Sequence, residues 1–359
     1  MRRSLGALIP MMVAAPLLAQ SPARIAQADS VLRQLVESYG VSGNEGPVRD
    51  VVRSMLPAWA KPETDTAGNL WVRAGKGGAP VVFVAHLDEI GFAVTGVRED
   101  GKLTVETRGG LFLSLYEGRP ALVHTPGGIV PGVFPPRDSA FSVRRPPPLV
   151  VDVGVASRVA AEELGVTVGS TVTSPKSYAR LAGTRATGRS FDDRVGCAAL
   201  ILAMRRLDPA RLRHEVIFVF SVREEIGLEG ARVVADALGV QPARVHAIDT
   251  FVSADTPIDP QAYAVAPLGA GPVIRAVDNS AVAPPALVDS LLALARSARI
   301  PLQSGTTSGG NDGSVFLGWG VPDVAVGWPL RYAHSPVEVA DLRDVERLAE
   351  LVEVIAGRW

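Results

Sequence analysis

Histidine and carboxylate side chains stand at the ends of several apolar segments of this chain. His86 and Asp88 follow the apolar run that begins at Pro80, and Glu224 and Glu225 follow a second such run. Similar boundary positions are taken by Asp192, Asp193, Asp249 and His334. Imidazole and carboxylate groups suit a hydrolytic divalent metal such as Zn²⁺, and the carboxylate of an HxD pair can accept the second ring N–H of a metal-bound histidine. The set therefore indicates a metal centre for hydrolysis.

Each of these residues also has an ordinary structural explanation when it is taken alone. A histidine after a strand is commonly a loop residue, and an aspartate such as Asp192 or Asp193 before a helix commonly caps that helix. Paired glutamates after a strand commonly form the exposed first turn of a helix, where they suit its dipole. The metal hypothesis rests on the whole set, because groups beyond the carboxyl ends of strands in an open α/β sheet can converge at one edge.

The composition excludes several classes of protein. The 359 residues include 36 Lys and Arg against 37 Asp and Glu, and the net charge of −1 gives no reason to expect nucleic acid or an anionic membrane as a partner. The single cysteine, Cys197, can neither close an internal disulfide nor build a thiolate metal site. Any metal must therefore be held by histidine and carboxylate groups.

Residues 1–20 have the pattern of a secretory signal peptide. Arg2 and Arg3 precede an apolar run from Leu5 to Ala19, which is short for a membrane span and ends among small residues. An uncleaved N-terminal anchor is the alternative. We expect the mature protein to be exported to the periplasm or the extracellular space, with no membrane contact once the signal has been removed.

The segments that carry the candidate ligands alternate between strand and helix patterns, with buried strands expected at 79–86 and 214–222. Such alternation predicts an α/β fold with a mostly parallel sheet flanked by helices. Between 95 and 188 the chain changes to short β-branched runs separated by glycine and proline. This pattern predicts a small β-rich, barrel-like domain inserted into a main domain of residues 21–94 and 189–359.

Five segments of the chain occur in a characteristic order: HLDEIGF (86–92), FDDRVG (191–196), REEIGLEGA (223–231), AIDT (247–250) and RYAHSPVEV (331–339). Together they resemble the glutamyl aminopeptidase and tetrahedral aminopeptidase family of dinuclear zinc metallopeptidases. The resemblance covers about 34–354, and five motifs at coherent spacing are far more specific than any one alone. It implies a zinc exopeptidase-like catalytic domain, and an insert that makes contacts between the subunits of a homo-oligomer, from a dimer to a dodecamer.

The resemblance implies two divalent metal ions per subunit, zinc by preference with cobalt as the alternative. His86 and Asp249 would bind one metal, and Glu225 and His334 would bind the other. Asp192 would bridge the two metals through its two carboxylate oxygens.

The resemblance also implies the chemistry. The protein would be an aminopeptidase that hydrolyses N-terminal residues from peptides with a hydroxide shared by the two metals. Glu224 would act as the general base that takes the proton of the water and returns it to the leaving amine, and Asp88 would orient His86. The peptide bond between Asp192 and Asp193 would be cis, as is typical of such families.

One segment departs from the family pattern. Residues 310–313 read Gly-Asn-Asp-Gly, where members usually have Gly-Thr-Asp-Ala. None of the implied ligands lies in this segment, so the change bears on substrate preference more than on metal binding.

Other functions stand as alternatives. The same dinuclear site would serve a deacylase or a related amidohydrolase. A catalytically inactive peptide-binding module is a further alternative, and the intact ligand set with Glu224 argues against it. A glycosidase would need two free carboxylates flanking the sugar bond, whereas the carboxylates here would be committed to metal.

Overall fold

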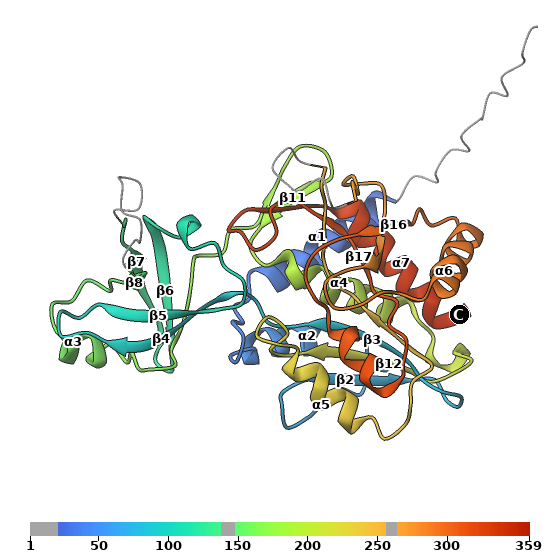
Figure 1. The fold of residues 1–359 in the computed structure, drawn as a ribbon, viewed down its shortest axis with the longest axis horizontal. Helices are drawn as coiled ribbons and strands as arrows, with labels where there is room; N and C mark the ends of the chain where they lie inside the picture. Colours follow the sequence, from blue (N-terminus) through green and yellow to red (C-terminus); the bar gives the residue numbers. More distant parts are fainter. Residues whose placement is uncertain (1–20, 138–147, 256–263) are drawn as a thin grey trace, which may run out of the picture.

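The computed structural model describes residues 21–137, 148–255 and 264–359 (Figure 1). The predicted signal peptide at 1–20 lies outside these described residues and stays a prediction. Helices in the described parts are α1 (Pro22–Val36), α2 (Gly46–Met55), α3 (Arg158–Glu163), α4 (Phe191–Arg206), α5 (Glu229–Ala237), α6 (Pro285–Ala298) and α7 (Leu342–Arg358). None of the described helices is long and apolar enough to cross a bilayer.

The central sheet combines parallel and antiparallel strands. Its order is β1 (Glu63–Thr64), β2 (Leu70–Ala74), β12 (Val216–Ser221), β3 (Val81–His86) and β13 (Arg244–Ala247). Strands β12 and β13 both run parallel to β3, and Ser221 lies opposite His86 at the end of the register. Strand β2 runs antiparallel to β12 and to β1. The predicted α/β fold is thus confirmed. The central sheet, however, is mixed and not mostly parallel as predicted.

A tight turn accounts for part of the antiparallel pairing. Asp65 Oδ1 accepts hydrogen bonds from the backbone N–H groups of Ala67, Gly68 and Asn69 at 2.9, 2.9 and 3.0 Å, which closes the turn between β1 and β2. Strands joined by so short a turn form a hairpin and must be antiparallel. The apolar pattern of β2 itself carries no information on strand direction, so the sequence prediction missed it.

Both faces of the central sheet are covered. Alternate side chains of β3 point to opposite faces. Val81 and Phe83 join a hydrophobic cluster with α1, α4 and α7, and Val82 and Val84 join another with α5 and the 3-10 helix η4 (Asp312–Trp319). Figure 1 shows α4 and α7 on one side of β3 and β12 and α5 on the other. This two-sided packing fixes the carboxyl ends of the strands, where the candidate ligands lie.

The part of the chain between β3 and α4 contains a six-stranded sheet. Its order is β7 (Gly128–Phe134), β6 (Arg119–Thr125), β9 (Thr171–Thr173), β4 (Gly91–Val97), β5 (Leu103–Arg108) and β8 (Val150–Val151). Reciprocal backbone hydrogen bonds of 2.8 and 2.9 Å join Val133 to Asp152, so the two edges meet and the sheet nearly closes. Phe92, Tyr116 and Phe134 belong to its own hydrophobic core. The domain boundaries at 94/95 and 188/189 stay a prediction.

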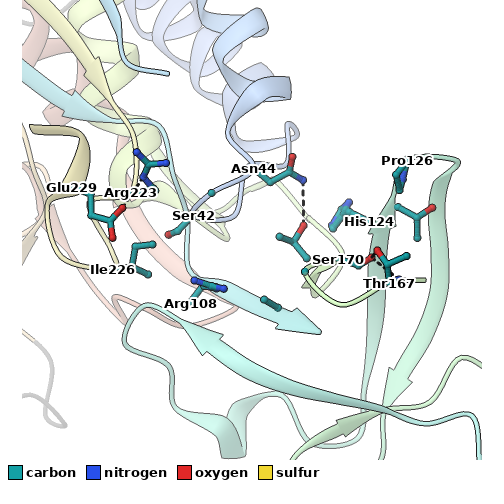
Figure 2. A pocket seen from close by; sticks show the side chains of 15 residues that line it. Ser42, Asn44, Arg108, His124, Pro126, Thr167, Ser170, Arg223, Ile226 and Glu229 are labelled. Atoms are coloured by element: carbon teal, nitrogen blue, oxygen red, sulfur yellow. Dashed lines mark hydrogen bonds and ion pairs between the residues drawn. The ribbon is translucent and has the colours of Figure 1, made fainter. Parts of the chain in front are cut away.

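The six-stranded sheet projects from the rest of the molecule (Figure 1). At its base lies a cavity of about 580 Å³, whose lining includes Arg108 from the sheet and Ser42 and Arg223 from the rest of the chain (Figure 2). Asn44 Nδ2 donates a hydrogen bond to Thr171 Oγ1 across this junction at 3.3 Å. The junction therefore combines a direct polar contact with a hollow.

Smaller sheets organise the later part of the chain. They consist of β10 (Ala179–Arg180), β11 (Arg185–Gly188) and β19 (Glu338–Asp341), of β14 (Phe251–Val252) and β18 (Pro329–Leu330), and of β16 (Gln303–Thr306), β15 (Val273–Val277) and β17 (Val326–Gly327). In the first of them, Gly188 pairs with Glu338. This pairing places the start of α4 beside the segment that carries His334.

Candidate metal centre

Three neighbouring strands end where candidate ligands begin. His86 is the last residue of β3, Glu224 and Glu225 follow β12, and Asp249 lies shortly after β13. Since these strands are parallel, their carboxyl ends share one edge of the central sheet. The structure therefore gathers groups that are up to 163 positions apart in the sequence, from 86 to 249.

Asp192 and Asp193 have different surroundings at the start of α4, where the backbone is not yet helical. The peptide bond between them is cis. Asp193 Oδ2 accepts from the N–H of His86 at 2.9 Å, and Oδ1 accepts from the N–H of Gly196 at 2.8 Å. A Cβ atom at Gly196 would lie 2.2 Å from Asp193 Oδ1, so this contact needs glycine. Asp193 thus ties the helix to β3, while Asp192 lines the cavity described below.

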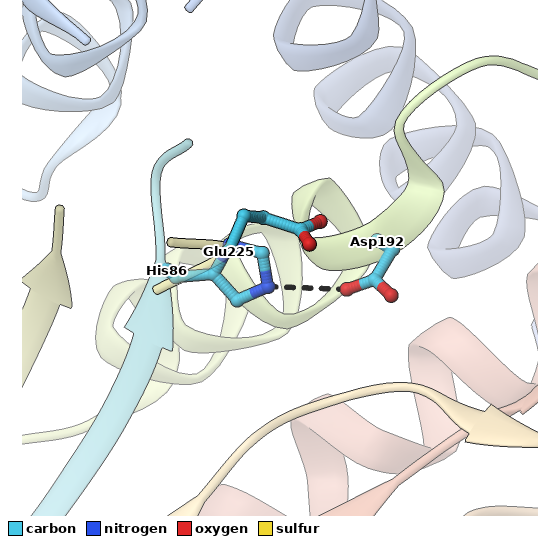
Figure 3. A group of neighbouring side chains, drawn as sticks. All are labelled: His86, Asp192 and Glu225. Carbon is cyan, nitrogen blue, oxygen red and sulfur yellow. Dashed lines mark hydrogen bonds and ion pairs between the residues drawn. The ribbon is translucent and has the colours of Figure 1, made fainter. Parts of the chain in front are cut away.

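The carboxylate of Asp192 lies between two imidazoles. Its Oδ1 is 3.1 Å from His86 Nε2, and its Oδ2 is 3.5 Å from His334 Nε2. Glu225 Oε1 lies 3.4 Å from the same nitrogen of His334, and it is buried without a hydrogen-bond partner among the described residues. His86, Asp192 and Glu225 each offer one ligand atom within 4.8 Å of the others (Figure 3). Histidine and carboxylate donors therefore converge on one small volume.

The other ring nitrogen of each histidine faces a backbone carbonyl. His86 Nδ1 lies 3.1 Å from the carbonyl oxygen of Asp88, and His334 Nδ1 lies 2.8 Å from that of Gly110. Donation to these carbonyls places the proton of a neutral imidazole on Nδ1 and leaves the Nε2 lone pair directed toward Asp192. A lone pair facing a carboxylate is repulsive unless a proton or a metal ion lies between the two atoms. The donor set therefore fits a divalent metal site.

Asp88 holds the segment that follows β12. It accepts from Ser42 Oγ at 2.6 Å and from the backbone N–H groups of Glu224 and Glu225 at 3.0 and 3.2 Å. Its Oδ1 also lies 3.4 Å from His86 Nδ1. Burial by itself raises the pKa of Asp88, but interactions with His86 and Ser42 outweigh burial, and the pKa is lowered. Asp88 is thus a buried anion that positions both glutamates.

The side chain of Glu224 lies beside His86, with 3.9 Å between Oε2 and the Nε2 atom of the imidazole. Burial raises the pKa of Glu224 well above its usual value, and the negative charges of Asp249 and Glu225 add to this effect. A divalent cation would offset such crowding of negative charge. The crowding of negative charge and the positions of the donor atoms thus both fit a divalent cation at this site.

Asp249 is paired with an arginine that the sequence did not predict. Arg275 Nη1 lies 3.1 Å from Asp249 Oδ1, and the backbone N–H of Thr250 donates to the same oxygen at 2.6 Å. Burial raises the pKa of Asp249 to about 7, although the charge of Arg275 opposes this. The sequence feature that could have indicated this role is the position of Arg275 in the otherwise apolar strand β15.

Buried carboxylates outside the predicted set also support the site. Glu338 accepts from the N–H groups of His334 and Phe191 at 2.9 and 2.6 Å, so it connects the histidine loop to the start of α4. Asp312 accepts from the hydroxyl of Ser221, the last residue of β12. Both carboxylates lie in segments that stood out in the sequence, at 331–339 and 310–313, yet nothing there indicated burial.

Glu89, the residue after the HxD pair, is the anion of a buried ion cluster. It accepts from the N–H of Gly40 at 2.9 Å, pairs with Arg189 at 2.9 Å, and contacts Lys176 Nζ and Ser190 Oγ. Burial by itself raises the pKa of Glu89, but the charges of Arg189 and Lys176 reverse the effect and lower the pKa far below its usual value. The cluster fixes the chain next to Asp88.

Replacing Glu89 with glutamine is expected to destabilise the fold by about 3–5 kcal/mol, because Lys176 and Arg189 would stay buried without their anion. Since the folded pKa is depressed, the stabilisation is fully present above the unfolded pKa of about 4.3 and is lost only as the pH falls toward the folded value. Urea unfolding at pH 7 measures the effect. Asp236→Asn, at an exposed position on α5, is the control and should change stability by no more than about 0.5 kcal/mol. Equal urea midpoints for the two variants would contradict the role of the cluster.

A cavity of about 910 Å³ opens onto these side chains. Its acidic and imidazole lining consists of Asp192, Glu224, Glu225, Asp249 and His334. His86 reaches this group through its contact with Asp192. A peptide end entering the cavity would therefore meet the candidate metal ligands directly.

An α/β fold with histidine and carboxylate donors gathered at the carboxyl edge of its sheet, beside an open cavity, fits a metal-dependent hydrolase. The family model for M42 glutamyl aminopeptidase matches residues 68–351, and the chain belongs to this family of aminopeptidases. The family predicted from the five segments is thereby confirmed.

Individual relatives cover nearly the whole chain. The lysyl aminopeptidase of Pyrococcus furiosus is 34% identical over 344 residues, which are 90% of this chain and 95% of the relative. The glutamyl aminopeptidase of Lactococcus lactis subsp. cremoris is 29% identical and covers 87% of this chain and 91% of its own. The solved TET1 peptidase of Pyrococcus horikoshii, described as assembling into a tetrahedron or a large octahedral shell, matches with a TM-score of 0.85 and 35% identity, over 92% of this chain and 100% of its own.

Proposed function

We propose that this protein removes N-terminal residues from peptides with two divalent metal ions, zinc by preference and cobalt as the alternative. The position of Asp192 carries the proposal, because its two oxygens face the Nε2 atoms of His86 and His334 at 3.1 and 3.5 Å. A carboxylate in this position suits a ligand shared by two metals. His86 and Asp249 would hold one ion, Glu225 and His334 would hold the other, and Asp192 would hold both.

Bound at these ligands, divalent cations would polarise the scissile carbonyl and make a water molecule more acidic. Glu224 would take the proton of the attacking water and deliver it to the leaving amine. The side chain of Glu224 lies beside the proposed ligands, with 3.9 Å between its Oε2 and His86 Nε2. Asp88 would keep Glu224 in place through the backbone hydrogen bond of 3.0 Å and would orient His86.

Metal removal and a pair of matched substrates test this function. The full chain, treated with a chelator, should lose turnover of leucine anilide and regain it with Zn²⁺ or Co²⁺. The N-acetylated anilide should not be cleaved, since an aminopeptidase needs a free α-amino group. Release of acetate from that substrate would favour the deacylase instead. No turnover of any aminoacyl anilide with metal present would favour the inactive binding module.

We further propose that the chain is exported after removal of residues 1–20 and forms a homo-oligomer through residues 95–188. Two observations support assembly: the solved Pyrococcus horikoshii relative is described as a tetrahedron or octahedral shell, and Ile129 and Val159 of the insert are 50% and 63% exposed. Light scattering should give a mass that is a multiple of the monomer, which is 37.7 kDa with the signal peptide included. A monomer at micromolar concentration would refute the assembly proposal, and an unprocessed N-terminus after expression in a secreting host would refute the export proposal.

A further inference from the structure

The cavity at the candidate metal centre has a second, apolar part. Its members are Phe112, Leu115, Leu228, Val252, Tyr332 and Val337. Phe112, Val337 and Tyr332 are 62%, 52% and 38% exposed, although large apolar side chains are usually buried. Apolar side chains gathered around one cavity mark a surface that binds something apolar.

This apolar part is built by segments that also touch the ligands. Tyr332 and Val337 flank His334 in sequence. After β5, Phe112 directly precedes the 3-10 helix η1 (Leu113–Leu115) and Leu115 ends it, and Gly110 of the same connecting segment accepts the Nδ1–H of His334 at 2.8 Å. The apolar wall therefore begins within a few residues of the groups that would bind the scissile bond.

A cationic substrate side chain finds no free partner in the described lining. The carboxylates there are Asp192, Glu224, Glu225 and Asp249, and the proposed function uses each of them as a metal ligand or as the base. A lysine side chain would have to compete with the metals for these groups.

An anionic substrate side chain also finds no free partner in the described lining. Besides His334, the cation of the described lining is Arg275, which is 3% exposed. Its guanidinium pairs with Asp249 at 3.1 Å and Asp278 at 2.9 Å, and donates to the carbonyl oxygens of Thr250 and Gly310 at 2.8 and 2.7 Å. These contacts occupy the guanidinium.

We infer that the N-terminal residue preferred by this cavity has a large apolar side chain, of the leucine or phenylalanine class, and that Phe112 and Val337 set this preference. The inference rests on the proposed aminopeptidase function and names its substrate class. It differs from the lysyl and glutamyl activities after which two relatives are named.

Kinetics on four aminoacyl anilides test the inference with the metal-loaded full chain. We expect kcat/KM for leucine and phenylalanine to exceed that for lysine and glutamate at least about tenfold, in keeping with what an apolar pocket gains from added methylenes. Phe112→Ala and Val337→Ala should lower kcat/KM for the phenylalanine anilide severalfold more than they lower kcat/KM for the alanine anilide. Val240→Ala is the matched control, because Val240 is 51% exposed against 52% for Val337 and lies outside this cavity.

A charge substitution and a binding measurement complete the test. Val337→Lys should raise the ratio of glutamate to leucine turnover at least about tenfold, since it adds an unpaired cation to the wall. Calorimetry on metal-loaded Glu224→Gln protein should show tighter binding of phenylalanine amide than of lysine amide.

The outcomes separate the two proposals. Preferred cleavage of lysine or glutamate anilide, or equal loss with Val240→Ala and Val337→Ala, would overturn the apolar specificity and leave the aminopeptidase function standing. No cleavage of any anilide would overturn the function itself, and the specificity with it.

Discussion

Replacing Glu224 with glutamine is expected to lower kcat by about 10²–10⁴-fold, the range that general acid–base catalysis contributes. Glutamine has nearly the same shape but cannot take a proton from water. The backbone N–H of residue 224 would still donate to Asp88, and His86, Asp192 and Glu225 would keep their positions. The metal content should therefore stay at the wild-type level, as measured by elemental analysis after dialysis.

The neighbouring residue provides the contrast for this experiment. Glu225→Ala removes the oxygen that lies 3.4 Å from His334 Nε2, so it should lower the metal content as well as the rate. Wild-type turnover in Glu224→Gln would show that another group is the base. Unchanged metal content in Glu225→Ala would reject its role as a ligand.

Replacing Asp192 with alanine is expected to have the broadest effect of any single ligand change. Its two oxygens face both histidines, at 3.1 and 3.5 Å, so its loss should weaken both metal sites together. We expect metal content to fall from the two equivalents proposed above to less than one, and turnover to become undetectable. Elemental analysis and leucine anilide hydrolysis measure the two effects.

An exposed aspartate gives the control for this variant. Asp236→Asn on α5 should retain both metals and full activity, because it lies outside the cavity. Loss of just one equivalent in Asp192→Ala would mean that Asp192 serves a single metal. A circular dichroism spectrum that matches the wild type excludes misfolding as the cause.

The sequence predicted those parts of the site that stand at strand ends. His86 and Glu224 follow strands that are recognisable as uninterrupted apolar runs, and parallel strands deliver their carboxyl ends to one edge. Their order in the chain, together with the segments around Asp192 and His334, was sufficient to predict the family. At these residues, the local strand pattern was enough to predict where the side chains lie in the fold.

Other features depend on contacts that a linear pattern does not contain. Arg275 is 35 positions from Gly310 and 26 from Asp249, and only the fold shows that it bonds to both. The direction of β2 is set by its pairing with β12, more than 140 residues later. The buried cations that pair with Glu89, Lys176 and Arg189, likewise come from segments about 90 to 100 residues away. Long-range pairing of this kind is decided by packing of the whole domain.

The hydrogen bond between His334 and the Gly110 carbonyl restricts how the enzyme can be re-engineered. That oxygen belongs to the backbone and comes from the loop after β5, so the contact depends on the length of this loop and on its glycines, since a Cβ atom at Gly110 would lie 3.2 Å from His334 Nδ1. In a chimera that takes the six-stranded sheet from a relative, the loop after β5 would have to place a main-chain oxygen within hydrogen-bonding distance of the His334 imidazole. A transplanted sheet with a longer or shorter loop after β5 would leave the His334 ring without this hydrogen bond, even when every ligand residue is kept.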